Sequence, residues 1–253
     1  MTITKVANIR RKVAIMVLIL MAPLSLFAFK TIEEYQDSID HAFDSIFFTS
    51  SLRFASPANY RLTEDDIRQV ANELGVEVAA IHAVVDIEAG SSHSGFYSQL
   101  EPIINFDRKF FRSLISKQPE KIRQNKATYA KIMADAPNQT HQQRNSNRLS
   151  LASEMDESIA IQSTFWGMFQ IGGFNWKKCG AQSPHQFAYL MSRSEHDQLE
   201  LFAKFLINSD LVKYLKAKNW SAFAYYYNGP RYRSKKYHIR LAAAYKKHLR
   251  NND

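Results

Sequence analysis

The stretch IHAVVDIEAGSS, from Ile81 to Ser92, decides the fold, because it places a carboxyl group where a helix should bury hydrocarbon. Ile81, Val84 and Val85 precede Glu88 by seven, four and three residues, which are the spacings of one helix face. Glu88 therefore continues an apolar stripe. A carboxyl group on such a face must be paired, neutralised or used in chemistry.

The composition favours one folded domain that is held together by its core. The chain has 253 residues, of which 45% are hydrophobic and 13% aromatic. A chain of this size buries roughly 70% or more of its unfolded surface. Cys179 is the only cysteine, so no internal disulfide can form and stability must come from packing.

The N-terminus is typical of an export signal. Residues 1–12 contain four basic side chains and no acid, and residues 13–29 are apolar apart from Ser25 and a break at Pro23. We expect cleavage after Ala28. The alternative is an uncleaved membrane anchor, because the apolar run approaches the lower limit for spanning a bilayer. In both cases we expect an exported protein that is periplasmic, secreted or held at the inner membrane of a bacterium.

The sequence predicts three regions. Residues 1–28 form the signal or anchor, residues 29–60 a helical extension with a linker, and residues 61–253 the main domain. Helical spacing of apolar residues marks positions 31–48 in the extension. The main domain is predicted to start with a helix that Thr63 caps and Gly75 ends, because three acids follow the threonine.

Further helices are expected along the main domain. Residues 116–134 are predicted to be helical in part, 135–147 to form a loop, and 149–162 to be helical again. Residues 194–218 are predicted to form one or two helices, with Ser209 as a second N-cap. The predicted inward face of this segment consists of Leu199, Phe202, Ala203 and Leu206.

Basic residues are concentrated near the C-terminus. The net charge is +9, and removal of the first 28 residues leaves +5. Residues 231–250 contain eight Lys or Arg and no acid, which is typical of the solvated side of a helix packed through Leu241, Ala244, Tyr245 and Leu249. The alternative is attraction to an anionic cell envelope. Export argues against nucleic acid as a partner.

Three further stretches combine polar residues with glycine and aromatic residues. EPIINFDRKFF (101–111) contains Asp107, STFWGMFQIGGFNW (163–176) contains Gln170, and FAYYYNGPRY (223–232) contains Tyr227 and Asn228.

Each stretch also has a purely structural interpretation. Asp107 could pair with Arg108 or Lys109 on the surface. The glycines of the second stretch could form turns of a short hairpin, with Trp166, Met168 and Gln170 sharing one face. The Asn-Gly-Pro sequence of the third stretch could simply end a helix.

Together and in this order, the four stretches resemble the lysozyme and lytic transglycosylase superfamily, and most closely its bacterial and phage N-acetylmuramidases. The matching blocks are Glu88-Ala-Gly-Ser, PIINFDRK (102–109), TFWGMFQIGGFN (164–175) and YNGPRY (227–232), and the resemblance covers about residues 62–245. It implies a predominantly α-helical α+β fold of the lysozyme type, with a small β-hairpin that lines the cleft. It also implies a glycoside hydrolase that acts on the glycan strands of peptidoglycan.

The resemblance assigns roles to individual residues. Glu88 matches the catalytic acid, which must still carry its proton near neutral pH, and partial burial raises the pKa of a carboxyl group in the way this requires. Asp107 matches a family glutamate and is the candidate second carboxylate. Gln170, Tyr227 and Asn228 match positions that line the substrate cleft.

Other residues are left with alternatives. Trp166, Phe169 and Phe174 would either stack on sugars or pack in the core. His82 is expected to be a hydrogen-bonded structural residue. The sequence contains no HExxH motif and no Cys/His cluster, so neither a metal nor another cofactor is expected.

Two functions other than hydrolysis remain as alternatives. A lytic transglycosylase would use the same acid and leave 1,6-anhydro-muramic ends. A catalytically silent cell-wall-binding protein on the same fold is motivated by departures from the family pattern, which are Asp107 for Glu, Lys109 for His and Ser91 for Gly.

Overall fold

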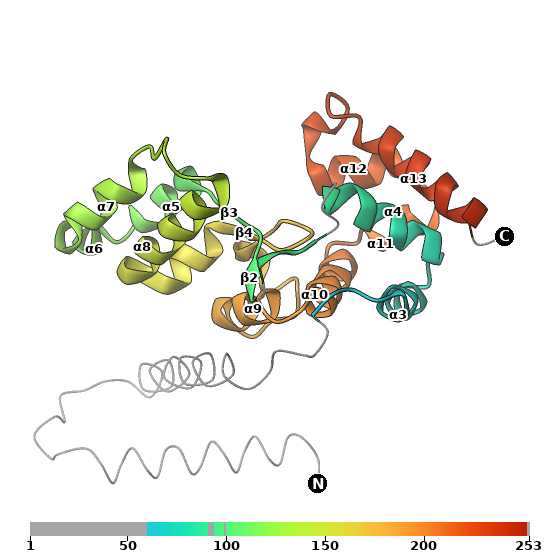
Figure 1. The fold of residues 1–253 in the computed structure, drawn as a ribbon, viewed down its shortest axis with the longest axis horizontal. Coiled ribbons are helices and arrows are strands. Elements are labelled where there is room, and N and C mark those ends of the chain that lie inside the picture. Colours follow the sequence, from blue (N-terminus) through green and yellow to red (C-terminus); the bar gives the residue numbers. More distant parts are fainter. Residues whose placement is uncertain (1–59, 91–93, 99, 252–253) are drawn as a thin grey trace, which may run out of the picture. The chain divides into compact units, whose positions relative to one another are not determined.

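The computed structural model describes residues 60–90, 94–98 and 100–251 (Figure 1). The expected signal over residues 1–28, the rest of the extension up to residue 59, and Ser91 lie outside the described residues. The described part is mostly helical with two small antiparallel sheets, which confirms the predicted class. Within it, no helix has both the length and the apolar character needed to cross a membrane.

The helices follow one another with short connections. They are α3 (Glu64–Leu74), α4 (Val78–Glu88), α5 (Arg108–Ile115), α6 (Pro119–Gln124), α7 (Lys126–Met133), α8 (His141–Gln162), α9 (Pro184–Met191), α10 (Glu195–Asn208), α11 (Val212–Lys216), α12 (Trp220–Asn228) and α13 (Tyr237–Asn251), with short 3₁₀ turns η3 (Gly173–Asn175) and η4 (Pro230–Tyr232).

The strands are short. They are β1 (Phe96–Ser98), β2 (Glu101–Pro102), β3 (Ile104–Phe106), β4 (Thr164–Trp166) and β5 (Ile171–Gly172). β1 pairs with β2, and β4 lies between β3 and β5 with Ile104 opposite Trp166. The hairpin predicted around Gly167 is therefore present, but the strand ends at Trp166. Met168 and Gln170 belong to the turn and do not continue one strand face.

The first helix of the domain begins and ends where the sequence predicts. The Thr63 side chain accepts a hydrogen bond from the Asp66 backbone N–H, and the Asp66 carboxylate accepts one from the Thr63 N–H, which completes a capping box. Gly75 ends the helix in the left-handed conformation, with φ 61°.

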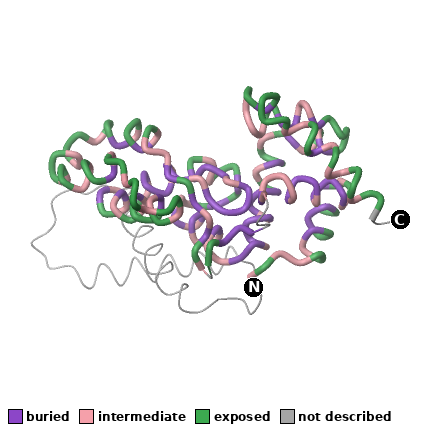
Figure 2. The backbone as a smooth tube through the Cα atoms, turned by 45° about the horizontal axis from the view of Figure 1, so that its top comes forward, coloured by how far each residue is buried: buried purple, intermediate pink, exposed green. Residues whose placement is uncertain are grey.

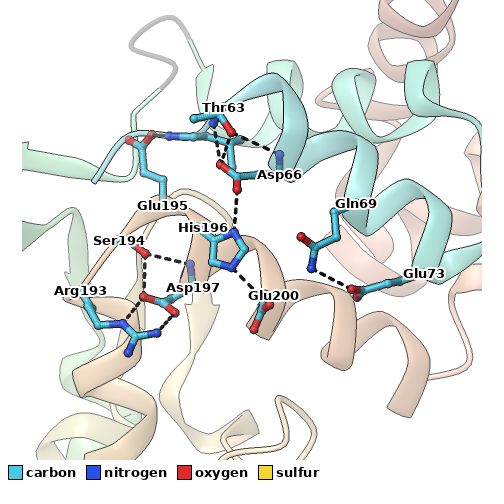
Figure 3. A network of polar contacts seen from close by, with 11 residues as sticks. Thr63, Asp66, Gln69, Glu73, Arg193, Ser194, Glu195, His196, Asp197 and Glu200 are labelled. Atoms are coloured by element: carbon cyan, nitrogen blue, oxygen red, sulfur yellow. Dashed lines mark hydrogen bonds and ion pairs between the residues drawn. The ribbon is translucent and has the colours of Figure 1, made fainter. Parts of the chain in front are cut away.

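A polar network joins α3 to α10 (Figure 3). His196 Nδ1 lies 2.8 Å from Asp66 Oδ1. Glu195 is almost fully buried and accepts hydrogen bonds from the backbone N–H groups of Leu62 and Gly95, each at 2.8 Å. Because a buried carboxylate is tolerated only when it is well bonded, these contacts fix the start of the domain against α10.

Helix α4 is the centre of the main core. Ile81, Val84 and Val85 are buried as predicted, and the alanines of α4 are buried too. α4 packs against α3 and α13. On its outer side His82 bonds Glu64 and stacks on His248 of α13, with ring centroids 4.7 Å apart. His82 is thus a hydrogen-bonded structural residue, as expected.

Helix α13 packs as predicted except at its end. Leu241 is fully buried, and Ala244 and Tyr245 are half-buried. Leu249 is 39% exposed, so its predicted packing role is wrong. In the last turn the inward contact comes from His248, whose Nε2 lies 2.8 Å from Asp86 of α4.

Two predictions about helix ends are wrong. The loop predicted over residues 135–147 stops at Thr140, which caps α8 in a second capping box. The helical start is hidden in the sequence because Asn145 and Arg148 are buried polar residues that bond the Phe106 N–H and the Ala134 carbonyl. Ser209 ends α10 and does not cap α11.

The buried residues form two clusters. The main one joins α3, α4, α9, α10, α12 and α13, and its buried members include the predicted inward residues of α10. The second joins β3, α5, α7 and α8 around Phe111 and Ile132. Most helices alternate buried and exposed positions along the chain (Figure 2).

Candidate active site

Glu88 is the last residue of α4 and is half-buried. Its helix is held in the core by the apolar stripe before it, and Gly90 follows with φ 62°, a conformation that suits glycine. The helix therefore ends just beyond the carboxyl group. Burial raises the pKa of Glu88 from its ordinary value to about 7, because a charged carboxylate is poorly solvated there.

Asn228 of α12 contacts this carboxyl group directly. Its Nδ2 donates a hydrogen bond of 3.1 Å to Glu88 Oε1, and this bond lowers the pKa of Glu88 against the larger effect of burial. α12 ends here because Gly229 adopts φ 81° and Pro230 cannot continue the helix. The Asn-Gly-Pro sequence therefore both stops a helix and places an amide at the acid.

Tyr227 is oriented toward the β4–β5 turn. Its hydroxyl donates a 2.7 Å hydrogen bond to the Phe169 carbonyl, and its ring packs on Phe202 and Phe223. Burial and the charge of Glu88 raise the pKa of this phenol well above its usual range. Tyr227 thus joins α12 to the turn that carries Gln170.

Gln170 lies in that turn with φ 46°, which few residues other than glycine adopt. Its Nε2 donates to the carbonyls of Gly167 at 2.9 Å and Ile103 at 3.3 Å. Gln198 of α10 supports the turn. It is fully buried and accepts a 2.7 Å hydrogen bond from the Met168 N–H. No sequence pattern identified Gln198.

The candidate aromatic residues divide into two groups. Trp166 is 5% exposed and donates from its indole to the Ile161 carbonyl, and Phe169 is 2% exposed and stacks on Phe202. The sequence left sugar stacking and core packing open for these two residues, and in the structure both rings pack in the core. Phe174 is 43% exposed, and its ring contacts those of Phe110 and Phe165 with centroids 5.0 Å and 6.1 Å away.

Asp107 caps helix α5. Its Oδ1 accepts hydrogen bonds from the backbone N–H groups of Lys109 at 2.8 Å and Phe110 at 3.0 Å. The surface ion pair with Arg108 is not formed, because the Arg108 guanidinium binds Asp135 and the Met133 carbonyl. Among the contacts of the described residues, none joins Asp107 to Glu88.

Three residues of the C-terminal segment interact electrostatically with Glu88 and were not predicted for the site. Arg240 and Lys235 lower the pKa of Glu88 through their positive charges. Tyr237 is half-buried, and burial together with the charge of Glu88 raises the pKa of its hydroxyl. The sequence predicted a basic helix that packs through apolar residues, but not its partner, because the packing of α13 on α4 is a long-range contact without a local signal.

The arrangement suits proton donation. Glu88 holds its proton near neutral pH, and Asn228 provides a polar contact that fixes the carboxyl group. These are the properties of a general acid that protonates a leaving oxygen.

Comparison with known proteins agrees with this chemistry. A model of the N-acetylmuramidase family matches residues 77–249, more than half of the chain. The crystal structure of the Burkholderia AP3 phage endolysin is similar, with 29% identity and a TM-score of 0.66 over 81% of this chain and 78% of that one. No match was found among the curated proteins. The helical architecture with small sheets is that of the lysozyme-like α+β fold. The chain belongs to the N-acetylmuramidase family.

Proposed function

We propose that the protein hydrolyses the bond between N-acetylmuramic acid and N-acetylglucosamine in peptidoglycan, with Glu88 as the general acid. One observation carries the proposal, which is that burial at the end of α4 raises the pKa of Glu88 to about 7. A glycosidic oxygen is a poor leaving group until it is protonated, so the acid must be protonated at the pH of the reaction.

Family membership supports the coarser assignment, a peptidoglycan hydrolase of the glycoside hydrolase type. The similar phage protein is described as an endolysin. We further propose that the reaction is hydrolysis and does not form an anhydro end. The presence of Asp107 as a candidate second carboxylate supports this choice. Asp107 would stabilise the positive charge of an oxocarbenium-like transition state or position a water molecule.

The remaining site residues would bind the substrate or position a residue that does. The amide of Gln170 and the exposed ring of Phe174 can contact hydroxyl groups and a sugar face. Tyr227 would position the turn that carries Gln170. Export by the N-terminal segment, which would deliver the enzyme to the cell wall, stays a prediction.

The test compares wild type with Glu88→Gln on purified sacculi, with Glu73→Gln as matched control. Glu73 is an exposed carboxylate of α3 whose side chain bonds Gln69 at 3.0 Å. We expect Glu88→Gln to lose about 100-fold or more of the digestion rate and Glu73→Gln to keep it.

Mass spectrometry of the released fragments separates the alternatives. Reducing muramic ends support hydrolysis, whereas 1,6-anhydro-muramic ends would assign the chain as a lytic transglycosylase. Equal binding of sacculi by wild type and Glu88→Gln, with digestion by neither, would assign a silent cell-wall-binding protein.

A further inference from the structure

A surface pocket of about 420 Å³ opens directly beside the catalytic end of α4. Ile87 and Gly90, which flank Glu88 in the chain, form one side. Arg240, Ala243 and Lys247 of α13 form the other. The pocket therefore adjoins the end of α4 that carries Glu88.

The charge of the pocket is positive. Arg240 and Lys247 are both exposed, and among the described residues neither forms an ion pair. Asp86 is the acid that lines the pocket, and it is bound by His248 at 2.8 Å. Within the described part of the chain, Arg240 and Lys247 therefore line the pocket without a carboxylate partner, whereas Asp86 is already bound by His248.

Arg240 contacts an aromatic ring of its own helix. Its guanidinium lies over the ring of Tyr237, 5.6 Å from the centroid. Tyr237 in turn lies close enough to Glu88 for the two groups to influence each other electrostatically. Through Tyr237, Arg240 lies near the end of the site that contains Glu88. The N–H groups of its guanidinium can still donate hydrogen bonds to a ligand.

We infer that this pocket binds a carboxylate of the peptide stem that branches from muramic acid. The inference rests on the proposed function, because only a muramic residue bound at Glu88 brings such a stem to the pocket. In peptidoglycan the lactyl group is amide-linked to the stem, so the anions near the scissile bond are the stem carboxylates. An arginine binds a carboxylate through two parallel hydrogen bonds, and Lys247 adds a point charge.

The experiment measures binding, so that catalysis does not interfere. The full chain carrying Glu88→Gln is titrated by calorimetry with N-acetylglucosaminyl-N-acetylmuramyl-tetrapeptide, and with the same compound after amidation of its carboxylates. We expect amidation to weaken binding about tenfold. Arg240→Gln and Lys247→Gln, each added to Glu88→Gln, should weaken binding of the free acid and leave binding of the amidated compound unchanged.

Lys246→Gln is the matched control. Lys246 is an exposed lysine next to Lys247, but it lines a different pocket on the other side of α13. Its removal takes away the same charge and should leave the preference for the free acid intact. A general effect of net charge would instead weaken binding equally in Lys246→Gln and Lys247→Gln, and would overturn the inference.

Other outcomes also decide the matter. Equal affinity for the acid and amidated compounds, or no measurable binding of either, overturns the pocket assignment. The pocket assignment is also overturned if Arg240→Gln weakens binding of the free-acid compound and of the amidated compound equally. Failure of the proposed function shows separately, because wild type would then leave sacculi undigested whatever the result of the titration.

Discussion

The amide of Asn228 donates a 3.1 Å hydrogen bond to the carboxyl group of Glu88, a residue 140 positions earlier in the chain. The Asn228 Oδ1 is buried and has no hydrogen-bond partner among the described residues. An amide can serve either form of the acid, since its NH₂ donates to a carboxylate and its carbonyl accepts from a carboxylic O–H. Rotation of the amide would thus keep Glu88 oriented before and after it gives up its proton.

Asn228→Ala should shift the pH dependence of catalysis to higher pH. The hydrogen bond from Asn228 lowers the pKa of Glu88, so its removal raises that pKa further. We expect the alkaline limb of the kcat/KM profile to move upward, with the exposed Asn105→Ala as control. A limb that stays in place would show that Asn228 does not bond the acid in solution.

Wild-type activity should fall as the pH rises through about 7, where Glu88 loses its proton. A general acid works only while protonated, so kcat/KM should drop about tenfold for each further pH unit. A pH series on soluble glycan fragments at constant ionic strength measures this limb. A rate that stays level to pH 9 would contradict the role of Glu88 as acid.

Glu88→Gln should be more stable than wild type at alkaline pH. The pKa of Glu88 is raised from 4.5 to about 7 in the fold, so the folded state binds the proton more tightly than the unfolded chain. Wild type therefore loses stability as the pH rises from 4.5 to 7, by about 3 kcal/mol, whereas glutamine does not titrate. Urea unfolding at pH 4 and pH 8 measures the difference, which should be present only at pH 8.

Asp107→Asn separates the two roles of that residue. Asparagine caps a helix about as well as aspartate, so the free energy of unfolding should stay within about 0.5 kcal/mol of wild type. The substitution removes the charge, and we expect kcat to fall by about tenfold or more. Asp107→Ala, as comparison, should also lose about 1 kcal/mol of stability. Full activity in Asp107→Asn would reduce the residue to a helix cap.

Much of the fold and part of the site follow from local sequence. The N-cap at Thr63, the buried stripe of α4 and the Asn-Gly-Pro stop are short-range patterns, and each is found where predicted. The loop predicted up to residue 147 is wrong because buried polar residues interrupt the apolar spacing of α8.

Some of the neighbours of Glu88 could not be predicted. Tyr237 and Arg240 reach the site only because α13 packs on α4, and nothing in either segment specifies that partner. Gln198 supports the turn because its side-chain oxygen accepts a hydrogen bond from the Met168 N–H, 30 residues earlier in the chain. Sequence spacing identifies faces of elements, whereas these contacts depend on how the elements meet.

Gln198→Leu should destabilise the fold and lower activity together. The substitution leaves two buried backbone groups without partners, the Met168 N–H and the Met191 carbonyl, which Gln198 bonds at 2.7 Å and 2.8 Å. We expect a loss of about 3 kcal/mol in urea unfolding, against little change for the exposed Gln69→Leu of α3. Because the turn that Gln198 supports carries Gln170, kcat/KM per folded molecule should fall as well. A destabilised variant with unchanged kcat/KM would place Gln170 outside the substrate site.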